Sequence, residues 1–266
     1  MKKLIASFVL AVISISAICA VDAVFAVDAV SAIPAVSDAS VSADHIAYAA
    51  NKPIKTVEVL NGNTPGTATL FGSGENFITD LKVTVKFDGF APYEIKLEDG
   101  YSPSIDAFDF GAEDKFLFCS SQTGGSGGYG NYRIYHLKIA SYELLYDDKL
   151  NSEQTTFSAE FKPNGFMTLQ DNSSENTLTV YVSYMDPTFY NKIFNNDGSL
   201  TGEQPYVNDI SFVSPSLNPA SGVYRLLTYR SVAAIAEINR LGYIVQTLNF
   251  DGAKFTAFST DFAINI

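Results

Sequence analysis

The chain has 266 residues, a formal net charge of −12 at pH 7, 13% aromatic residues and two cysteines. Such a negative charge repels phosphate backbones and anionic lipid, which argues against nucleic acid and membrane surfaces as partners. A chain of this length can build a sizeable core, and one domain is the expected count. Cys19 lies in a segment that we expect to be removed. Cys119 would then stand alone, so no internal disulfide would stabilise the domain.

The N-terminus has the pattern of a secretory signal. Lys2 and Lys3 precede an apolar run over residues 4–20. Asp22 interrupts the apolar stretch before it reaches the roughly 20 residues that a membrane-spanning helix needs. We therefore expect a signal peptide over residues 1–26, an extracellular or cell-surface location, and a mature domain that is not inserted into the membrane.

The next segment, residues 27–54, is rich in Ala, Val, Ser and Asp and has no aromatic residue before Tyr48. It shows no sustained periodicity that would bury one face of a helix or strand. These features are typical of a flexible linker. The folded domain is expected over residues 55–266, because alternating apolar and polar residues begin there.

Alternating apolar and polar residues mark short strands through this domain. In residues 81–87 the residues Leu81, Val83, Val85 and Phe87 would share one face, while the lysines and threonine between them take the other. Further strands are expected at residues 56–60, 93–96, 104–110, 115–120, 131–137, 143–146, 156–161, 166–169, 177–184, 209–213, 223–229, 243–249 and 254–258. Turns are expected at residues 61–63 and 251–252, where Asn, Asp and Gly tolerate positive φ.

Only residues 231–240 resemble a helix, because alanines favour one there and Gly242 would end it. The sequence therefore predicts an all-β fold with one short helix. Many short strands at regular spacing favour a propeller-like arrangement, with a β-sandwich or a barrel as the alternatives.

Two stretches of the domain carry a resemblance to a known family. They are residues 68–147, with the motifs GYSPSIDAFDF and GGSGGYGNYRIYHLK, and residues 192–258, with GVYRLLTYR and RLGYIVQTLNFDGAKF. Together they resemble secreted or spore-associated Gram-positive proteins of the VCBS or FG-GAP-like repeat type. The resemblance implies repeated β-units of propeller type. It implies no established activity, because these proteins are mostly uncharacterised.

Such repeats usually have a D-x-D-x-D-G loop whose carboxylates suit a calcium ion, because hard cations need several converging oxygen ligands. Here the corresponding loop is shortened, and Ala112 stands where a ligand is expected. Asp109, Glu113 and Asp114 are the weak calcium candidates that remain. A solvated acidic turn is the preferred interpretation, so we expect no metal and no cofactor.

The segment Gly124–Gly128 formally satisfies G-x-S-x-G, the nucleophile elbow of serine hydrolases. However, a strand rather than a helix is expected after Ser126. The two histidines, His45 and His136, stand in no plausible order with an orienting acid. The pattern thus gives no coherent catalytic set, and we expect a protein that is not an enzyme.

The glycines are better explained by the freedom they give the backbone to turn sharply. Tyr129, Asn131 and Tyr132 follow the loop and are the predicted ligand-binding residues, since aromatic faces can stack on sugar rings or on a peptide. A plain connection between two strands is the competing interpretation.

The sequence therefore favours an extracellular, non-catalytic interaction or surface module, with a cell-surface glycan or protein as its partner. Two alternatives stay open. One is a secreted hydrolase that acts on polysaccharide or peptide, which would need two carboxylates converging in a cleft. The other is a structural component of a cell or spore surface.

Overall fold

A computed structural model describes residues 53–112, 114–125, 128–174 and 176–264. All of them belong to one compact unit, His45–Ile266. The predicted signal peptide and nearly all of the predicted linker lie outside the described residues, as do Ser126, Glu113 and His45.

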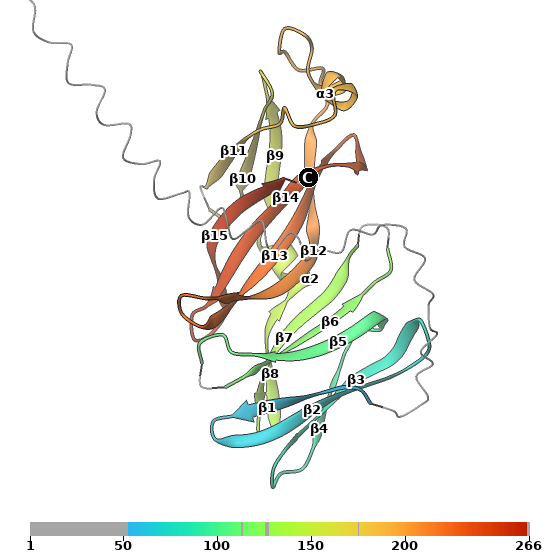
Figure 1. Ribbon diagram of the computed structural model, residues 1–266, viewed down its shortest axis with the longest axis vertical. Coiled ribbons are helices and arrows are strands. Elements are labelled where there is room, and N and C mark those ends of the chain that lie inside the picture. The colour runs from blue at the N-terminus through green and yellow to red at the C-terminus, as the bar shows by residue number, and fades with distance from the viewer. Residues whose placement is uncertain (1–52, 113, 126–127, 175, 265–266) are drawn as a thin grey trace, which may run out of the picture. The chain divides into compact units, whose positions relative to one another are not determined.

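The described chain forms fifteen strands and two short helices (Figure 1). The first eight strands are β1 (Pro53–Asn61), β2 (Thr64–Ser73), β3 (Phe77–Phe87), β4 (Tyr93–Lys96), β5 (Gly100–Phe108), β6 (Phe116–Gln122), β7 (Gly130–Lys138) and β8 (Ser141–Asp147). There follow α2 (Asp148–Gln154), β9 (Phe157–Lys162), β10 (Phe166–Asp171), β11 (Thr177–Tyr181), α3 (Pro187–Ile193), β12 (Pro205–Asn218), β13 (Val223–Ala234), β14 (Ala236–Phe250) and β15 (Phe255–Ile264).

The strands form three antiparallel sheets. An eight-stranded sheet runs β1-β2-β3-β5-β6-β7-β8, with β4 paired to β3. A three-stranded sheet runs β11-β10-β9, and a four-stranded sheet runs β12-β13-β14-β15. This confirms the all-β prediction. A propeller is not confirmed, because sheets of eight, three and four strands are not copies of one blade. No sheet closes into a barrel within the described residues.

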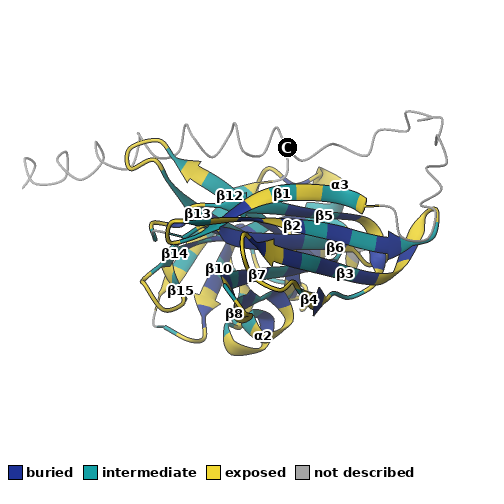
Figure 2. Cartoon of the chain, turned by 90° about the horizontal axis from the view of Figure 1, so that it is seen from below, coloured by how far each residue is buried: buried dark blue, intermediate teal, exposed yellow. Residues whose placement is uncertain are grey.

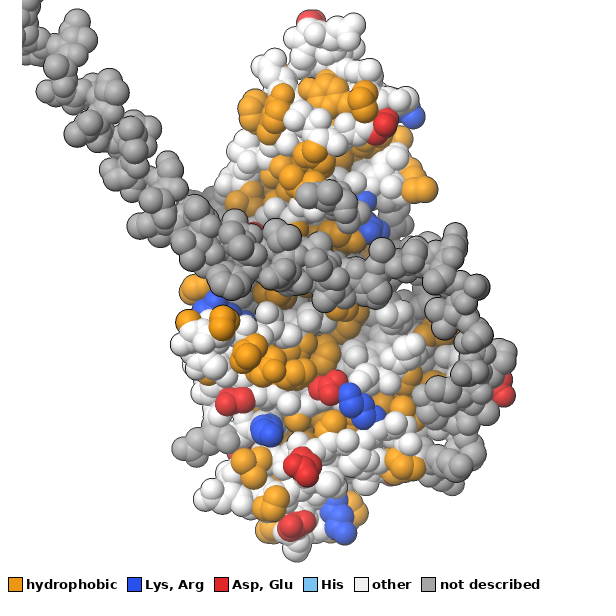
Figure 3. All heavy atoms as spheres, viewed as in Figure 1, with side chains coloured by type: hydrophobic (Ala, Val, Ile, Leu, Met, Phe, Trp, Pro, Cys, Tyr) orange, Lys and Arg blue, Asp and Glu red, His pale blue; other side chains and the backbone are white. Residues whose placement is uncertain are grey.

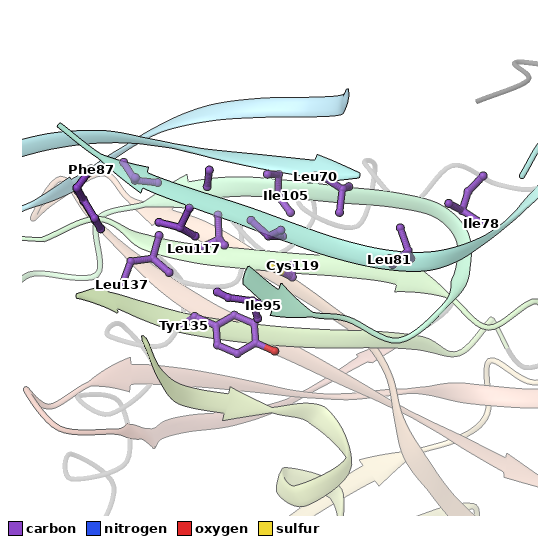
Figure 4. Packing of buried hydrophobic residues seen from close by; sticks show 14 residues of the cluster. Leu70, Ile78, Leu81, Phe87, Ile95, Ile105, Leu117, Cys119, Tyr135 and Leu137 are labelled. Carbon is purple, nitrogen blue, oxygen red and sulfur yellow. The ribbon is translucent and has the colours of Figure 1, made fainter. Parts of the chain in front are cut away.

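The first hydrophobic cluster fills the space enclosed by the eight-stranded sheet (Figure 4). The predicted inward face of β3 is confirmed, since its alternate residues Leu81, Val83, Val85 and Phe87 are all buried. In Figure 4, Leu70 and Phe87 on one layer face Ile105, Leu117 and Leu137 on the other. Burying each such side chain contributes about 1.5–3 kcal/mol, so packing can stabilise these described strands without a disulfide.

Two further clusters hold the rest of the domain. One joins β9 and β10 to β13 and β14, and includes Phe161, Met167 and Ile244. The other joins β6 and β7 to β12–β14, with Phe116 and Leu226 among its members. Figure 2 shows the resulting alternation of buried and exposed residues along the strands.

The predicted helix over residues 231–240 is wrong. Residues up to Ala234 continue β13, Ala236 begins β14, and Ile235 makes the reversal with a φ of 67°. Val232 and Ala234 are fully buried in the second cluster. Burial of this strand end overrides the weak helical propensity of alanine, because an isolated ten-residue helix is marginal. Gly242 does not end a helix. Glycine is needed at this position because a Cβ would lie only 2.4 Å from the Ala263 carbonyl oxygen on β15.

Both helices that do form begin at an aspartate cap. The Asp147 carboxylate accepts hydrogen bonds from the backbone N–H groups of Lys149 and Leu150 at the start of α2. Asp186 does the same for α3, where Pro187 occupies the first turn. These are standard helix-start signals in a sequence.

The face shown in Figure 3 carries acidic and basic side chains close together over the β1–β8 part, while hydrophobic side chains are prominent over the part that holds β9–β15. As for membrane-spanning segments, none of the helices in the described residues has the length and hydropathy that a span requires.

Candidate functional site

The glycine loop follows β6 and lies against an aromatic side chain of β5. Gly124 has a φ of +80°, and a Cβ at this position would lie 2.3 Å from the Tyr101 ring. The loop is closed by Thr123, whose backbone N–H and hydroxyl both donate to the Tyr129 carbonyl oxygen at 2.9 Å. Glycine is therefore required at position 124 both for its backbone conformation and for its close approach to Tyr101.

Tyr101 belongs to an exposed aromatic pair. Phe77 on β3 and Tyr101 on β5 are register partners, and their ring centroids lie 5.1 Å apart in a T-shaped arrangement. The two residues are 40% and 39% exposed. We call Phe77, Tyr101 and the adjoining glycine loop the aromatic ledge. Sequence reasoning missed both rings, because their pairing depends on a contact between strands that are not consecutive.

The three predicted ligand-binding residues do not share one surface. Tyr129 is half-buried at the end of the loop. Asn131 is buried on β7 and its side-chain amide donates to the Ser121 hydroxyl at 3.3 Å. Tyr132 is buried in the third cluster, where it stacks on Phe118, and burial raises the pKa of its hydroxyl to about 12. Its ring is thus unavailable to a ligand at the loop, and of the three only Tyr129 lies at the ledge.

Of the three calcium candidates, Asp109 and Asp114 lie within the described residues, and they form different sets of hydrogen bonds. The exposed Asp109 accepts a hydrogen bond from the Gly111 backbone at 2.7 Å. Asp114 instead bonds Asn61, the Gly62 backbone and His136, which lies 2.7 Å from its carboxylate. Asp114 therefore fastens the β1–β2 turn to β7. Within the described ranges, no three His, Cys, Asp or Glu side chains are grouped so that they could hold a metal ion.

A second group of charged residues surrounds Arg133 on β7. Its guanidinium contacts Asp147 and Glu98, each at 2.7 Å, and Lys149 also reaches Glu98. Burial alone would raise the pKa of Glu98, but its bonds to Lys149 and Arg133 outweigh burial and lower that pKa. The carboxylates of Glu98 and Asp147 thus stay ionised and ion-paired. These ion pairs join β7, β8 and α2.

The face of the four-stranded sheet between the second and third clusters is polar although it is buried. Thr228 and Arg230 on β13 and Gln246 on β14 are each at most 3% exposed. The Arg230 guanidinium donates to the Thr155 hydroxyl at 2.9 Å and lies over the Phe157 ring. Burial lowers the pKa of Arg230, although it stays a strong base. Both polar atoms of the Gln246 side chain lack a hydrogen-bond partner within the described part of the chain.

Cys119 is a free cysteine in the described part of the chain. Cys119 is 2% exposed in the first cluster, and burial raises the pKa of its thiol. A buried thiol of this kind acts as a small apolar side chain rather than as a nucleophile.

These features define an all-β protein with an exposed aromatic ledge and a buried polar sheet face. A family model described as the YybI C-terminal domain matches residues 155–263, which include β9–β11, α3 and β12–β14. Among curated proteins, the chain is similar to the uncharacterized protein YybI of Bacillus subtilis (strain 168). The two are 23% identical over 158 residues, which is 59% of this chain and 60% of that protein. The chain therefore spans less than two thirds of that relative.

No solved structure matches the chain. The similarity is to an uncharacterised protein of a Gram-positive bacterium. The resemblance to VCBS or FG-GAP repeats receives no support from these comparisons.

Proposed function

We propose that this protein is an exported, non-catalytic binding module and that the aromatic ledge is its ligand-binding surface. The observation that carries the proposal is the exposed Phe77–Tyr101 pair together with the glycine loop that packs against Tyr101. Two large rings, each about 40% exposed, are held in a fixed arrangement by strand register and by the adjoining glycine loop. Rigid aromatic side chains give a ligand large contact area at a low entropic cost.

A cell-surface glycan is the ligand class that fits the ledge best. A sugar ring places its apolar C–H face on an aromatic ring, while its hydroxyls need hydrogen-bond partners nearby. The Thr123 hydroxyl donates to the Tyr129 carbonyl oxygen, and its own oxygen can still accept a hydrogen bond from a sugar hydroxyl. An extended peptide is the second class, and the test below separates the two.

The absence of catalysis rests on how the acidic groups are used. Glycoside hydrolysis needs two carboxyl groups that face a common cleft. Glu98 and Asp147 are instead ion-paired to Arg133, and Asp106 is ion-paired to Lys55 at 2.6 Å. A structural role on a cell or spore surface differs from both ligand binding and hydrolysis, because it predicts self-assembly without a soluble ligand.

The test is an array of cell-wall glycans, cell-wall fragments and surface peptides probed with the full exported chain. The variant is Phe77→Ala together with Tyr101→Ala. A matched control comes from Phe166→Ala with Tyr181→Ala, since these two residues are also exposed register partners, with ring centroids 5.2 Å apart.

We expect glycan binding that falls at least about tenfold in the ledge variant and is unchanged in the control, since stacking on each ring contributes on the order of 1 kcal/mol. Equal binding by both variants would remove the ledge as the site. Peptide binding in place of glycan binding would overturn the ligand class, and hydrolysis of an arrayed polymer would favour the enzyme alternative.

A further inference from the structure

A second site lies away from the ledge, in a cavity of about 220 Å³ between the three-stranded and four-stranded sheets. One part of its wall is apolar and includes Phe157 on β9, Leu178 on β11 and Ile244 on β14. The other part is polar and includes Asp171 at the end of β10 and Thr260 on β15. The volume is below that of drug-sized pockets and fits a compact molecule of roughly ten non-hydrogen atoms.

Asp171 places a carboxylate in this wall although the residue is only 5% exposed. One of its oxygens accepts hydrogen bonds from the Ser173 backbone at 2.9 Å and from the Ser173 hydroxyl at 2.6 Å. The ion pairs formed by the described residues include none to Asp171, and neither Lys nor Arg lines the cavity. The buried Arg230 interacts with Asp171 electrostatically but forms no ion pair with it. A buried carboxylate without a direct ion pair favours a cation over an anionic ligand.

We propose that this cavity binds a small primary amine with an apolar body. An ammonium group has three N–H donors and no acceptor, so it can donate to the Asp171 carboxylate in the cavity wall. The apolar part of the molecule then contacts Phe157, Leu178 and Ile244. The negative charge of the whole protein, −12, adds a long-range attraction for cations.

The experiment is a ligand-observed NMR titration of the full chain with 2-phenylethylamine. The same titration with 2-phenylethanol is the probe control, because it has the same carbon skeleton without the charge. The key variant is Asp171→Asn, whose amide oxygen can still accept from Ser173. Its matched control is Asp197→Asn, because Asp197 is exposed and bonds Ser199 with the same pair of distances, 2.9 Å and 2.6 Å.

A third variant, Leu178→Trp, fills the cavity and tests where binding occurs. We expect the amine to bind more tightly than the alcohol and to lose at least about tenfold in affinity in Asp171→Asn, as for a hydrogen bond to a charged group. Asp197→Asn should bind like the wild-type protein, and Leu178→Trp should not bind. The melting temperature of each variant checks that it is folded.

Equal affinity for the amine and the alcohol would overturn the proposal, as would an unchanged affinity in Asp171→Asn. The proposal would also be overturned if the amine did not bind at about 10 mM, which corresponds to a binding free energy weaker than about −3 kcal/mol. The result is independent of the proposed function, because Phe77→Ala with Tyr101→Ala alters the ledge and should leave amine binding unchanged.

Discussion

At the scale of single residues, Asp148 is the carboxyl group whose ionisation is disfavoured most clearly by its surroundings. It is 5% exposed, and its carboxylate accepts a hydrogen bond from the Tyr132 backbone N–H at 2.8 Å. Burial raises its pKa from 3.8 to about 6, although the Tyr132 hydrogen bond acts in the opposite direction. Folding therefore favours the protonated form. The stabilising effect is fully present below about pH 4 and is lost as the pH rises through about 6.

Asp148→Asn should remove this penalty, because asparagine is neutral and keeps an oxygen for the Tyr132 N–H. At pH 7 we expect the free energy of unfolding to rise by about 2–3 kcal/mol, and at pH 4 we expect little change. Urea unfolding of both proteins from pH 4 to pH 8 measures the difference. A variant that is less stable than the wild-type protein at pH 7 would show that the anion is stabilised in the folded state.

At the scale of elements, Arg133 connects β7 with the start of α2. Its side chain is 21% exposed and that of Asp147 only 8%, so the pair is largely removed from water. Arg133→Met should lower the free energy of unfolding by about 3 kcal/mol, because it leaves the Asp147 carboxylate buried without its cation. Lys82→Met is the matched control: Lys82 is 42% exposed and its partner Glu94 is 51% exposed, so the loss should stay below about 1 kcal/mol.

Chemical denaturation of the two variants gives the comparison directly. Equal losses would mean that Arg133 contributes no more than a surface charge. The pH dependence is a further check, since burial would raise the pKa of Asp147 but its hydrogen bonds, that with Arg133 first, lower it. The stability from this pair should therefore be lost as the pH falls, and Arg133→Met should weaken that acid sensitivity.

The elements also show which local signals were sufficient. The turns at residues 61–63 and 251–252 and the inward face of β3 follow from short-range rules, and the structure confirms them. The caps at Asp147 and Asp186 are equally local signals for the start of a helix. The sequence analysis nevertheless predicts neither helix, because it relies on the regular spacing of strands. The proposed helix over residues 231–240 failed for the opposite reason, since tertiary burial outweighed alanine propensity.

The candidate site was less predictable than the strands. The sequence singled out the glycine loop as a special conformation, and the positive φ of Gly124 agrees with this. The ligand-binding residues predicted beside the loop and the exposed Phe77–Tyr101 pair are different residues, and the choice between them stays a prediction. Tyr132 alternates inward along β7, whereas Phe77 and Tyr101 meet only when β3 pairs with β5. No pattern within one strand specifies such a register, so residues 24 positions apart in sequence could not be paired from the sequence alone.

At the scale of the whole molecule, the third cluster joins the part that matches the YybI C-terminal domain to the strands that precede it. Phe116 on β6 contacts the ring of Phe250 on β14, with ring centroids 4.9 Å apart. The backbone N–H of Tyr224 also donates to the Asp109 carbonyl oxygen at 2.8 Å. The strands β12–β15 are therefore expected to draw part of their stability from β5–β8.

Adjacent residues of β6 allow this coupling to be tested. Phe116 is 1% exposed in the third cluster, while Leu117 is fully buried in the first cluster, on the opposite face of the strand. Phe116→Ala should cost about 3–5 kcal/mol in the free energy of unfolding, and Leu117→Ala about 2–5 kcal/mol. Hydrogen exchange followed by mass spectrometry should then show faster exchange in β14 and β15 for Phe116→Ala, and in β2 and β3 for Leu117→Ala, because local stability depends on the contacts of each segment. Faster exchange confined to β5–β8 in both variants would instead mean that the strands matching the family model are stable without the rest of the chain.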